Sequence, residues 1–186
     1  MKTKPFKIVG LALTALLLMS MSISIKAQDK SDCGSAKFEI KEVDAVKALV
    51  IKSDIPMADI GTAMGSVYGQ LFAYLEANNI QPAGPPFTVY LKWDPEGNVV
   101  FESGIPVTKT ESGKDEIVYK EYPAMKALST LYKGSYDKME PVYNELMEYM
   151  KTNNLEGDDT AWEIYLTDPG KVAPEENQTI IYFPIK

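Results

Sequence analysis

One acidic residue, Glu163, stands in the most aromatic stretch of the chain, between Trp162 and Ile164 and two positions before Tyr165. A carboxylate is costly to place among apolar neighbours unless a partner compensates its charge. A cationic ligand would supply that compensation, because a carboxylate and the faces of aromatic rings both attract positive charge. The alternative is that Glu163 lies on a solvated face of a strand and meets no ligand.

The composition excludes several kinds of catalytic and metal site. The chain contains no His and a single Cys. A Ser-His-Asp or Cys-His set, a His-ligated zinc and a His-ligated haem are therefore excluded. Acid–base chemistry would have to come from Glu, Asp, Tyr or Lys. We predict neither a metal nor a cofactor.

The charge of the chain argues against nucleic acid as a partner. The formal net charge is −7 at pH 7, and every basic residue is Lys. Nucleic-acid-binding domains carry a basic surface, usually with Arg, and this chain has neither. An acidic protein more readily meets cations or neutral organic molecules. We therefore predict a small hydrophobic or cationic organic molecule as the partner, and no nucleic acid.

Residues 1–27 have the layout of a secretory signal peptide. Three lysines form a basic start, an apolar run follows, and the small residue Ala27 precedes the expected cleavage point. A retained membrane anchor is the alternative, since the run approaches the length that spans a bilayer. We predict a secreted or periplasmic protein that has no membrane contact after cleavage. Residues 28–36 are expected to be flexible, with Cys33 as a free thiol.

Four segments of the first half recur in the same order in the second half. The pairs are KEVDAVKAL (41–49) and KEYPAMKAL (120–128), YLEANNI (74–80) and YMKTNNL (149–155), FTVYL (87–91) and WEIYL (162–166), and SGIPV (103–107) and IYFPI (181–185). One match could arise by chance, whereas four in the same order indicate an internal duplication. Within one domain over 37–186, we place repeat 1 at 37–107, a linker at 108–115 and repeat 2 at 116–186.

Each repeat has the pattern of two strands, one helix and two closing strands. Period-2 segments open each repeat, and Asp-Pro turns separate the strands that close it. Between them, apolar residues recur at the spacing of a helix face. These residues are Ile60, Met64, Val67, Leu71 and Leu75 in repeat 1, and Met139, Val142, Tyr143, Leu146 and Met150 in repeat 2. The predicted fold is α+β: duplicated β-β-α-β-β units form two antiparallel sheets, with helices on one side and a pseudo-twofold ligand groove between the halves.

The segment YKGSYDKMEPVYNELMEYMKTNNLEGDDTAWEIYLTDPG (132–170) resembles the second half of the GyrI-like small-molecule-binding domain. That domain is also the effector-binding part of AraC- and MerR-type drug-sensing regulators. The matching features are Gly134, Tyr136 and the Glu-x-Tyr-Leu-x-Asp-Pro run at 163–169. GPPFTVYL (84–91) and FESGIPV (101–107) resemble the first half, so the resemblance covers 37–186.

The resemblance implies a duplicated α+β fold with an open cleft. In family members that sense drugs, the acid matching Glu163 meets cationic aromatic ligands among stacked rings, which implies multidrug binding. Some stand-alone members are similar in fold but hydrolyse strained cyclopropane-containing natural products with carboxylate and aromatic groups of the cleft. Unlike the regulators, this sequence has an export signal and no DNA-binding segment, so a transcriptional role is not expected.

Strand alternation sorts the residues around Glu163 onto two faces. Glu163 and Tyr165 lie on one face, and Trp162, Ile164 and Leu166 lie on the other. We expect the three apolar residues on the helix-covered side. The Glu and Tyr are then expected on the groove side.

Five further residues complete the predicted ligand site. They are Tyr90, which matches Tyr165 in repeat 1, and Tyr68, Tyr132, Tyr136 and Glu102. For two of them an alternative stays open: Tyr68 could cap the core, and Glu102 could lie on a solvated edge. Tyr143 and Tyr149 have helical spacing and are expected to pack or lie on the surface, and Trp93 is expected to shield a hairpin.

These observations favour a binding protein over an enzyme. We predict an exported protein that holds an amphipathic or cationic organic ligand in the groove around Glu163. One alternative is a hydrolase of the same fold that uses Glu163 as general acid or base. Another is a partner-binding protein that uses a sheet edge.

Overall fold

The computed structural model describes residues 37–186. The predicted signal peptide at 1–27, the segment at 28–36 and Cys33 lie outside the described residues. No helix between residues 37 and 186 has the length and apolar character needed to cross a membrane.

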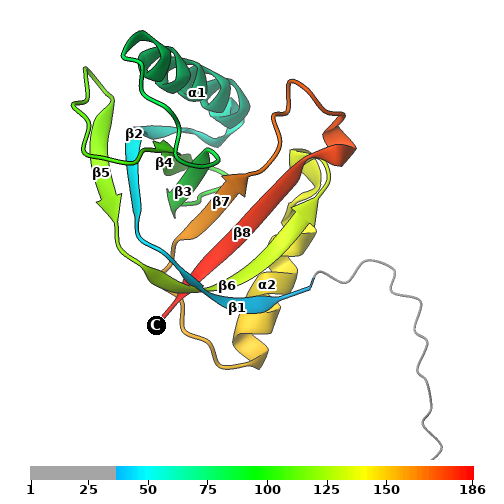
Figure 1. Ribbon diagram of the computed structural model, residues 1–186. Helices are drawn as coiled ribbons and strands as arrows, with labels where there is room; N and C mark the ends of the chain where they lie inside the picture. Colours follow the sequence, from blue (N-terminus) through cyan, green and yellow to red (C-terminus); the bar gives the residue numbers. More distant parts are fainter. Residues whose placement is uncertain (1–36) are drawn as a thin grey trace, which may run out of the picture. The chain divides into compact units, whose positions relative to one another are not determined.

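Strands and helices follow the same order in both halves of the described chain (Figure 1). The first half contains β1 (Glu39–Val43), β2 (Val46–Pro56), α1 (Ile60–Ala77), β3 (Phe87–Lys92) and β4 (Asn98–Pro106). The second half contains β5 (Val118–Tyr122), β6 (Met125–Lys133), α2 (Glu140–Thr152), β7 (Ala161–Tyr165) and β8 (Gln178–Ile185). Short 3-10 helices occur at η1 (Met57–Asp59), η2 (Tyr136–Lys138) and η3 (Pro174–Glu176). Each half therefore runs strand, strand, helix, strand, strand, as the hydrophobic pattern predicts.

The strands form one curled, eight-stranded antiparallel sheet, not the two sheets expected from the sequence (Figure 1). The strand order is β1-β6-β8-β7-β3-β4-β2-β5. A single sheet results because β3 pairs with β7 and joins the two halves. In addition, β1 pairs with β6 and β5 pairs with β2, so the first strand of each half extends the other half of the sheet. Exchanging the two halves gives the same order read from the opposite end, and duplication as its origin stays a prediction.

Helix α1 packs on the sheet through one apolar stripe. Its buried residues are Val67, Leu71 and Leu75, which lie four positions apart. They pack on Leu49 and Ile51 of β2 in one hydrophobic cluster. Burial of each such side chain stabilises the fold by about 1.5–3 kcal/mol, so this stripe fixes the position of α1.

Helix α2 is shorter and has one buried residue, Leu146, which packs with Leu128 of β6 and Ile181 of β8. Both helices are followed by an Asn in the left-handed region, Asn79 with φ 54° and Asn154 with φ 53°. Asn tolerates this conformation better than most residues, so the two helices end in the same way.

Both helices cover the face of the sheet that carries Glu163. One row of side chains on this face runs, by register, through Ile51, Ser103, Thr88, Glu163, Ile181 and Thr130. Trp162 and Ile164 pack on the opposite face instead, with Phe87 and Val50. The expectation that the apolar residues of β7 face the helices is therefore wrong. Alternation separates the two groups correctly, but it does not say which group the helices cover.

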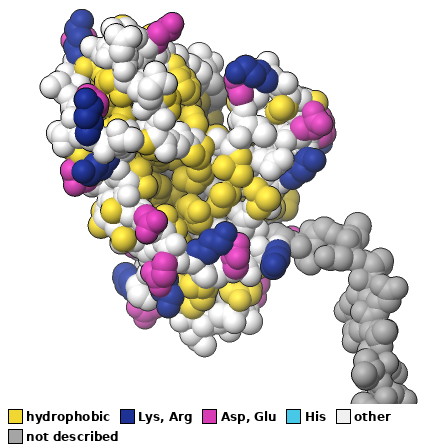
Figure 2. All heavy atoms as spheres, in the orientation of Figure 1, with side chains coloured by type: hydrophobic (Ala, Val, Ile, Leu, Met, Phe, Trp, Pro, Cys, Tyr) yellow, Lys and Arg dark blue, Asp and Glu magenta, His cyan; other side chains and the backbone are white. Residues whose placement is uncertain are grey.

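The face opposite the helices has a broad apolar surface. In Figure 1, β6 and β8 pass in front of α2, so Figure 2 views this face, where hydrophobic side chains gather across the middle. Phe87 stacks on Trp162, with ring centroids 5.3 Å apart. A hollow of about 340 Å³ lies on this face, and Val46, Ile164 and Tyr182 also line it.

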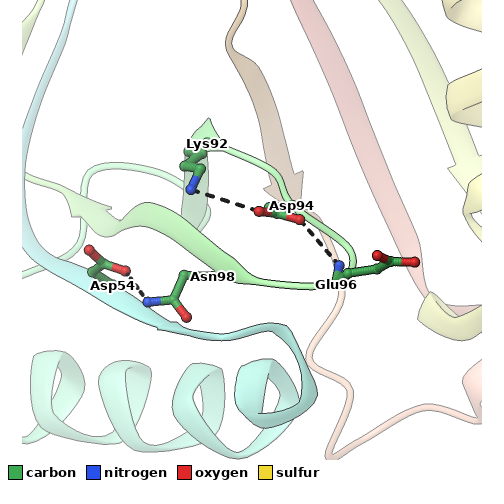
Figure 3. A network of polar contacts seen from close by, with 5 residues as sticks. All are labelled: Asp54, Lys92, Asp94, Glu96 and Asn98. Carbon is green, nitrogen blue, oxygen red and sulfur yellow. Dashed lines mark hydrogen bonds and ion pairs between the residues drawn. The ribbon is translucent and has the colours of Figure 1, made fainter.

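The segment DPEGN between β3 and β4 forms a turn, as its Asp-Pro and Gly predict (Figure 3). Asp94 Oδ1 accepts a hydrogen bond from the backbone N–H of Glu96 at 3.2 Å, and Lys92 Nζ lies 3.9 Å from Asp94. Asn98 donates to Asp54 of β2 at 2.8 Å. These contacts fix the end of β3, next to Tyr90 and Trp93.

Candidate ligand-binding site

Glu163 lies in the middle of β7, where the two halves of the sheet join. It faces Thr88 of β3 on one side and Ile181 of β8 on the other. It is only 6% exposed, although it is an acid. The alternative of a solvated strand face is therefore wrong.

Three tyrosine hydroxyls donate hydrogen bonds to the buried carboxylate. Tyr143 of α2 donates to Oε1 of Glu163 at 2.6 Å. Tyr165 of β7 and Tyr90 of β3 donate to Oε2 at 2.7 Å and 3.2 Å. Hydrogen bonds to an ionised acceptor are stronger than those between neutral groups. The donors come from both halves of the chain: the β3–β7 junction positions two of them, and helix α2 positions the third.

Burial controls the protonation of this cluster. It raises the pKa of Glu163 above the ordinary value of 4.5, and the three hydrogen bonds oppose this rise without cancelling it. Burial, and then the charge of Glu163, raise the pKa values of Tyr90, Tyr143 and Tyr165 well above 10. The three hydroxyls therefore stay protonated at neutral pH and serve as neutral donors to the acid.

Two of the predicted tyrosines flank Tyr165. Tyr68 of α1 and Tyr136 of η2 each lie edge-on to the Tyr165 ring, with centroids 5.9 Å apart. Tyr68 donates to the carbonyl oxygen of Phe87 at 2.7 Å, and its hydroxyl lies 2.9 Å from Oγ1 of Thr88. Tyr136 is 39% exposed. Tyr68 is thus anchored to β3, whereas Tyr136 forms a solvent-facing edge of the cluster.

Trp93 lies at the other end of the cluster, next to a β-bulge. The register of β3 against β4 shifts between Tyr90 and Lys92, which leaves Leu91 as an extra residue. The bulge returns Trp93 to the face of Tyr90, and the two rings lie edge-on with centroids 5.4 Å apart. Trp93 is 58% exposed. Beyond the expected shielding of the hairpin, Trp93 therefore contacts a tyrosine that binds Glu163.

Sequence reasoning misses Tyr143, which makes the shortest hydrogen bond to Glu163. Its ring does pack, as its helical spacing predicts, against Phe183 with centroids 5.7 Å apart. The hydroxyl, however, extends beyond that contact to the acid. The only signal in the sequence is a tyrosine within an otherwise aliphatic stripe that must face the strands.

Tyr132 is a predicted site residue that lies away from Glu163. It is on the same face, but two strands away, beyond β8. Its hydroxyl donates to the carbonyl oxygen of Ser135 at 2.8 Å, and its ring packs in the cluster beneath α2. Tyr132 therefore supports the segment that carries Tyr136.

Glu102 is a predicted site residue that lies on the opposite face. It pairs with Val89 of β3, and Val89 belongs to the cluster of Trp162. Glu102 accepts a hydrogen bond from Tyr122 at 2.8 Å and forms an ion pair with Lys120. It is 8% exposed, so the solvated edge is wrong as well. The tyrosine cluster around Glu163 therefore contains one acid, not two.

Solved structures share this fold at low sequence identity. The crystal structure of the EcmrR C-terminal domain aligns with a TM-score of 0.73 and 21% identity, over 82% of this chain and 99% of that chain. A hydrolase from Listeria innocua aligns with a TM-score of 0.61 and 15% identity, over 83% and 94%. SAV2435 bound to tetraphenylphosphonium aligns with a TM-score of 0.58 and 10% identity, over 81% and 94%. The chain spans 57% of EcmrR as seen in its DNA complex. At these identities, the likeness shows the fold alone.

Sequence comparison identifies the family. No curated protein matches the chain. The family model for the GyrI-like small molecule binding domain matches residues 36–186, which include both helices and all strands around Glu163. The resemblance drawn from residues 132–170 is thereby confirmed. The chain belongs to the family of GyrI-like small-molecule-binding domains.

Proposed function

We propose that this protein binds an organic cation at Glu163. The observation that carries the proposal is a buried carboxylate held by the neutral hydroxyls of Tyr90, Tyr143 and Tyr165. No lysine between residues 37 and 186 forms an ion pair with it. A buried charge without an opposite charge is unfavourable, so a positively charged ligand would supply what the protein lacks.

The surrounding rings favour a cation that carries aromatic or other apolar groups. Tyr68, Tyr136 and Tyr165 form one side of the cluster, and Tyr90 and Trp93 form the other. Aromatic ring faces attract cations and also pack against apolar groups. The aromatic cation tetraphenylphosphonium is bound to SAV2435, which shares the fold, and this supports the same ligand class here. Recognition by one charge and several rings would accept many such cations, which is multidrug binding.

A hydrolase is the second candidate, and the raised pKa of Glu163 favours it. A carboxyl group whose pKa is moved toward neutrality can hold and release a proton at mild pH. Burial has this effect on the pKa of Glu163, and one protein of the same fold is a hydrolase. In this role Glu163 would act as general acid or base, oriented by Tyr143 and Tyr165. Product formation from a reactive ligand by the wild type, absent in Glu163→Gln, would establish this second role.

The site would lie between two duplicated units. Thr88 and Glu163 pair at the centre of a strand order that is symmetric under exchange of the halves. This symmetry supports the repeats at 37–107 and 116–186, with a groove on the pseudo-twofold axis. Only the second unit has the acid, so the ligand would bind off-centre.

The proposal includes export of the protein from the cytoplasm. Its basis is the basic start, the apolar run and Ala27, which lie outside the described residues. Mass spectrometry of secreted or periplasmic material should find a chain that begins near Gln28. A chain that keeps Met1 and stays in the membrane fraction would contradict export without affecting the ligand site.

Calorimetric titration with tetraphenylphosphonium tests the ligand site. Glu163→Gln keeps the shape of the side chain and removes its charge, so binding should weaken by about 1.5–3 kcal/mol. The matched control is Glu102→Gln, because Glu102 is 8% exposed and Glu163 is 6% exposed. Glu102 lies on the opposite face, so its replacement should leave the affinity unchanged. Equal affinities of the wild type and Glu163→Gln would contradict the proposal.

A further inference from the structure

Two buried hydroxyl groups beside the candidate site have no hydrogen-bond partner. Among the side chains of residues 37–186, Thr130 Oγ1 and Thr179 Oγ1 are the buried polar atoms left without one. Thr130 is 1% exposed and Thr179 is not exposed. A buried hydroxyl that makes no hydrogen bond costs free energy, and most buried polar groups in folded proteins are paired.

Both threonines lie on the face of the sheet that carries Glu163. Thr179 belongs to β8 and Thr130 to β6, so the two residues extend the Glu163 cluster across these strands. Thr179 lies directly across the β7–β8 strand pair from Tyr165, one of the three residues that donate a hydrogen bond to Glu163. Thr130 pairs with Ile181, which in turn pairs with Glu163. Thr130 and Thr179 are diagonal neighbours on one face of the β6–β8 pair.

The first half of the sheet has apolar residues at the corresponding places. Phe101 pairs with Tyr90 as Thr179 pairs with Tyr165. Ile51 is the counterpart of Thr130: the two residues stand at opposite ends of the row of side chains that runs through Glu163. Phe101 and Ile51 are buried core residues, packed in the clusters beneath α1. The fold therefore accepts apolar side chains at these places, and the hydroxyls in the second half serve no packing need.

Tyr136 is a neighbour of Thr179. Burial and the charge of Glu163 raise the pKa of Tyr136, and the hydroxyl of Thr179 opposes the rise, although it makes no hydrogen bond with any partner. Tyr136 is 39% exposed and lies in the short helix η2. A ligand that displaces Tyr136 would reach Thr179 along Tyr165.

We infer that Thr179, with Thr130 behind it, forms a hydrogen-bonding subsite for an uncharged polar group of the ligand. The preferred ligand is then an organic cation that carries a hydroxyl or amide group, with the cation at Glu163 and the polar group at Thr179. This inference rests on the proposed function and adds a second point of recognition to it. The ligand would supply the hydrogen bond that Thr179 lacks in the free protein.

Matched phosphonium probes test this subsite by calorimetric titration. The probes are tetraphenylphosphonium, (4-hydroxyphenyl)triphenylphosphonium and (4-fluorophenyl)triphenylphosphonium, where fluorine fills space without donating a hydrogen bond. The wild type should bind the hydroxyl probe about two- to twelvefold more tightly than the fluoro probe, the range for one added hydrogen bond. Thr179→Val should abolish this preference, and Thr179→Ser, which keeps a hydroxyl, should retain it.

Thermal unfolding of the free protein provides a second measurement. Thr130→Val and Thr179→Val remove unpaired hydroxyls, so neither should lower the Tm. Thr88→Val should lower it, because the Thr88 hydroxyl is paired with Ser103 at 3.0 Å and with Tyr68 at 2.9 Å. A Tm loss for Thr179→Val as large as that for Thr88→Val would mean that Thr179 is already satisfied, and would overturn the inference.

The titration outcomes also separate the inference from the proposed function. If all three probes bind the wild type equally, or if Thr179→Val keeps the preference, the subsite is wrong and the cation site stands. If no probe binds the wild type, the cation site fails and the subsite fails with it.

Discussion

Thr88 and Glu163 face each other across the β3–β7 pair, at the centre of the strand order. Thr88 is satisfied by neutral neighbours, Ser103 and Tyr68. Among the described residues, Glu163 has the only carboxylate on this part of the sheet face, and three tyrosine hydroxyls donate hydrogen bonds to it. The two halves thus place different chemistry at matched positions, and the negative charge lies to one side of the centre.

The free energy of unfolding should depend on pH through Glu163. Burial raises the folded-state pKa above 4.5, so the folded protein holds a proton that the unfolded chain releases. The resulting stabilisation is fully present below pH 4.5 and is lost as pH rises through the folded pKa. Glu163→Gln does not titrate, so it does not lose this stabilisation as pH rises. The difference in Tm between Glu163→Gln and the wild type should therefore increase with pH, by about 2–4 °C for each kcal/mol of stabilisation that the wild type loses. A Tm difference that stays constant from pH 4 to pH 8 would show that the pKa of Glu163 is not raised.

Tyr143→Phe should destabilise the protein and raise the pKa of Glu163 further, because it removes the 2.6 Å hydrogen bond to Oε1. A hydrogen bond to a charged group contributes about 1.5–3 kcal/mol. The loss should shrink in a Glu163→Gln background, and a double-mutant cycle in urea measures that coupling. Tyr149→Phe on the same helix is the control, since Tyr149 packs against Phe38 with centroids 5.2 Å apart. Equal losses in both backgrounds would mean that Tyr143 acts through packing alone.

Fluorescence should report ligand binding through Trp93. The chain has two tryptophans: Trp93 is 58% exposed beside Tyr90, and Trp162 is 7% exposed on the opposite face. Tetraphenylphosphonium should therefore change the emission of the wild type and leave that of Trp93→Phe nearly unchanged. The affinity of Trp93→Ala should fall by about 0.5–1 kcal/mol, the range for an exposed cation–π contact. A full response in Trp93→Phe would place the ligand near Trp162, on the other face.

Gly134→Ala should destabilise the turn that carries Tyr136. Gly134 has φ +153°, which side-chain-bearing residues rarely adopt, and an added Cβ would lie 2.5 Å from the hydroxyl of Tyr132. We expect a loss of about 1–2 kcal/mol in the free energy of unfolding. Gly65→Ala in α1 is the control, because a Cβ there meets no atom within 4 Å, and it should stabilise by about 0.5–1 kcal/mol. Thermal unfolding should show a lower Tm for Gly134→Ala and a higher Tm for Gly65→Ala. Equal changes in Tm for the two variants would mean that Gly134 is not strained.

The sequence predicts the part of this fold that depends on local periodicity. Helix positions such as Leu71 and Leu146 follow from 3.6-residue spacing, and the pairing of Glu163 with Tyr165 on one face follows from alternation. The repeated segments also predict the order of elements in each half. The joining of the halves into one sheet is not local, because it depends on the β3–β7 pair, whose residues lie about 75 positions apart.

The errors in the candidate site have the same origin. Glu102 lies within a strand, as expected, but only its pairing with Val89 shows that its side chain faces away from the helices. Trp93 joins the site because a bulge at Leu91 inverts the alternation of side chains along β3, and no residue type there predicts a bulge. Tyr143 satisfies the helix pattern through its ring, so its hydroxyl bond to Glu163 is visible only in three dimensions.

The exchange of first strands between the halves has a consequence for the order in which the chain can fold. β1 begins at Glu39, but its partner β6 ends only at Lys133, so the first strand has no partner until most of the chain has been made. Likewise, β2 gains its second neighbour only after β5 is complete at Tyr122. Contacts between such distant residues form slowly, because a long loop must close first. A chain that ends before Tyr122 therefore cannot complete either side of the sheet.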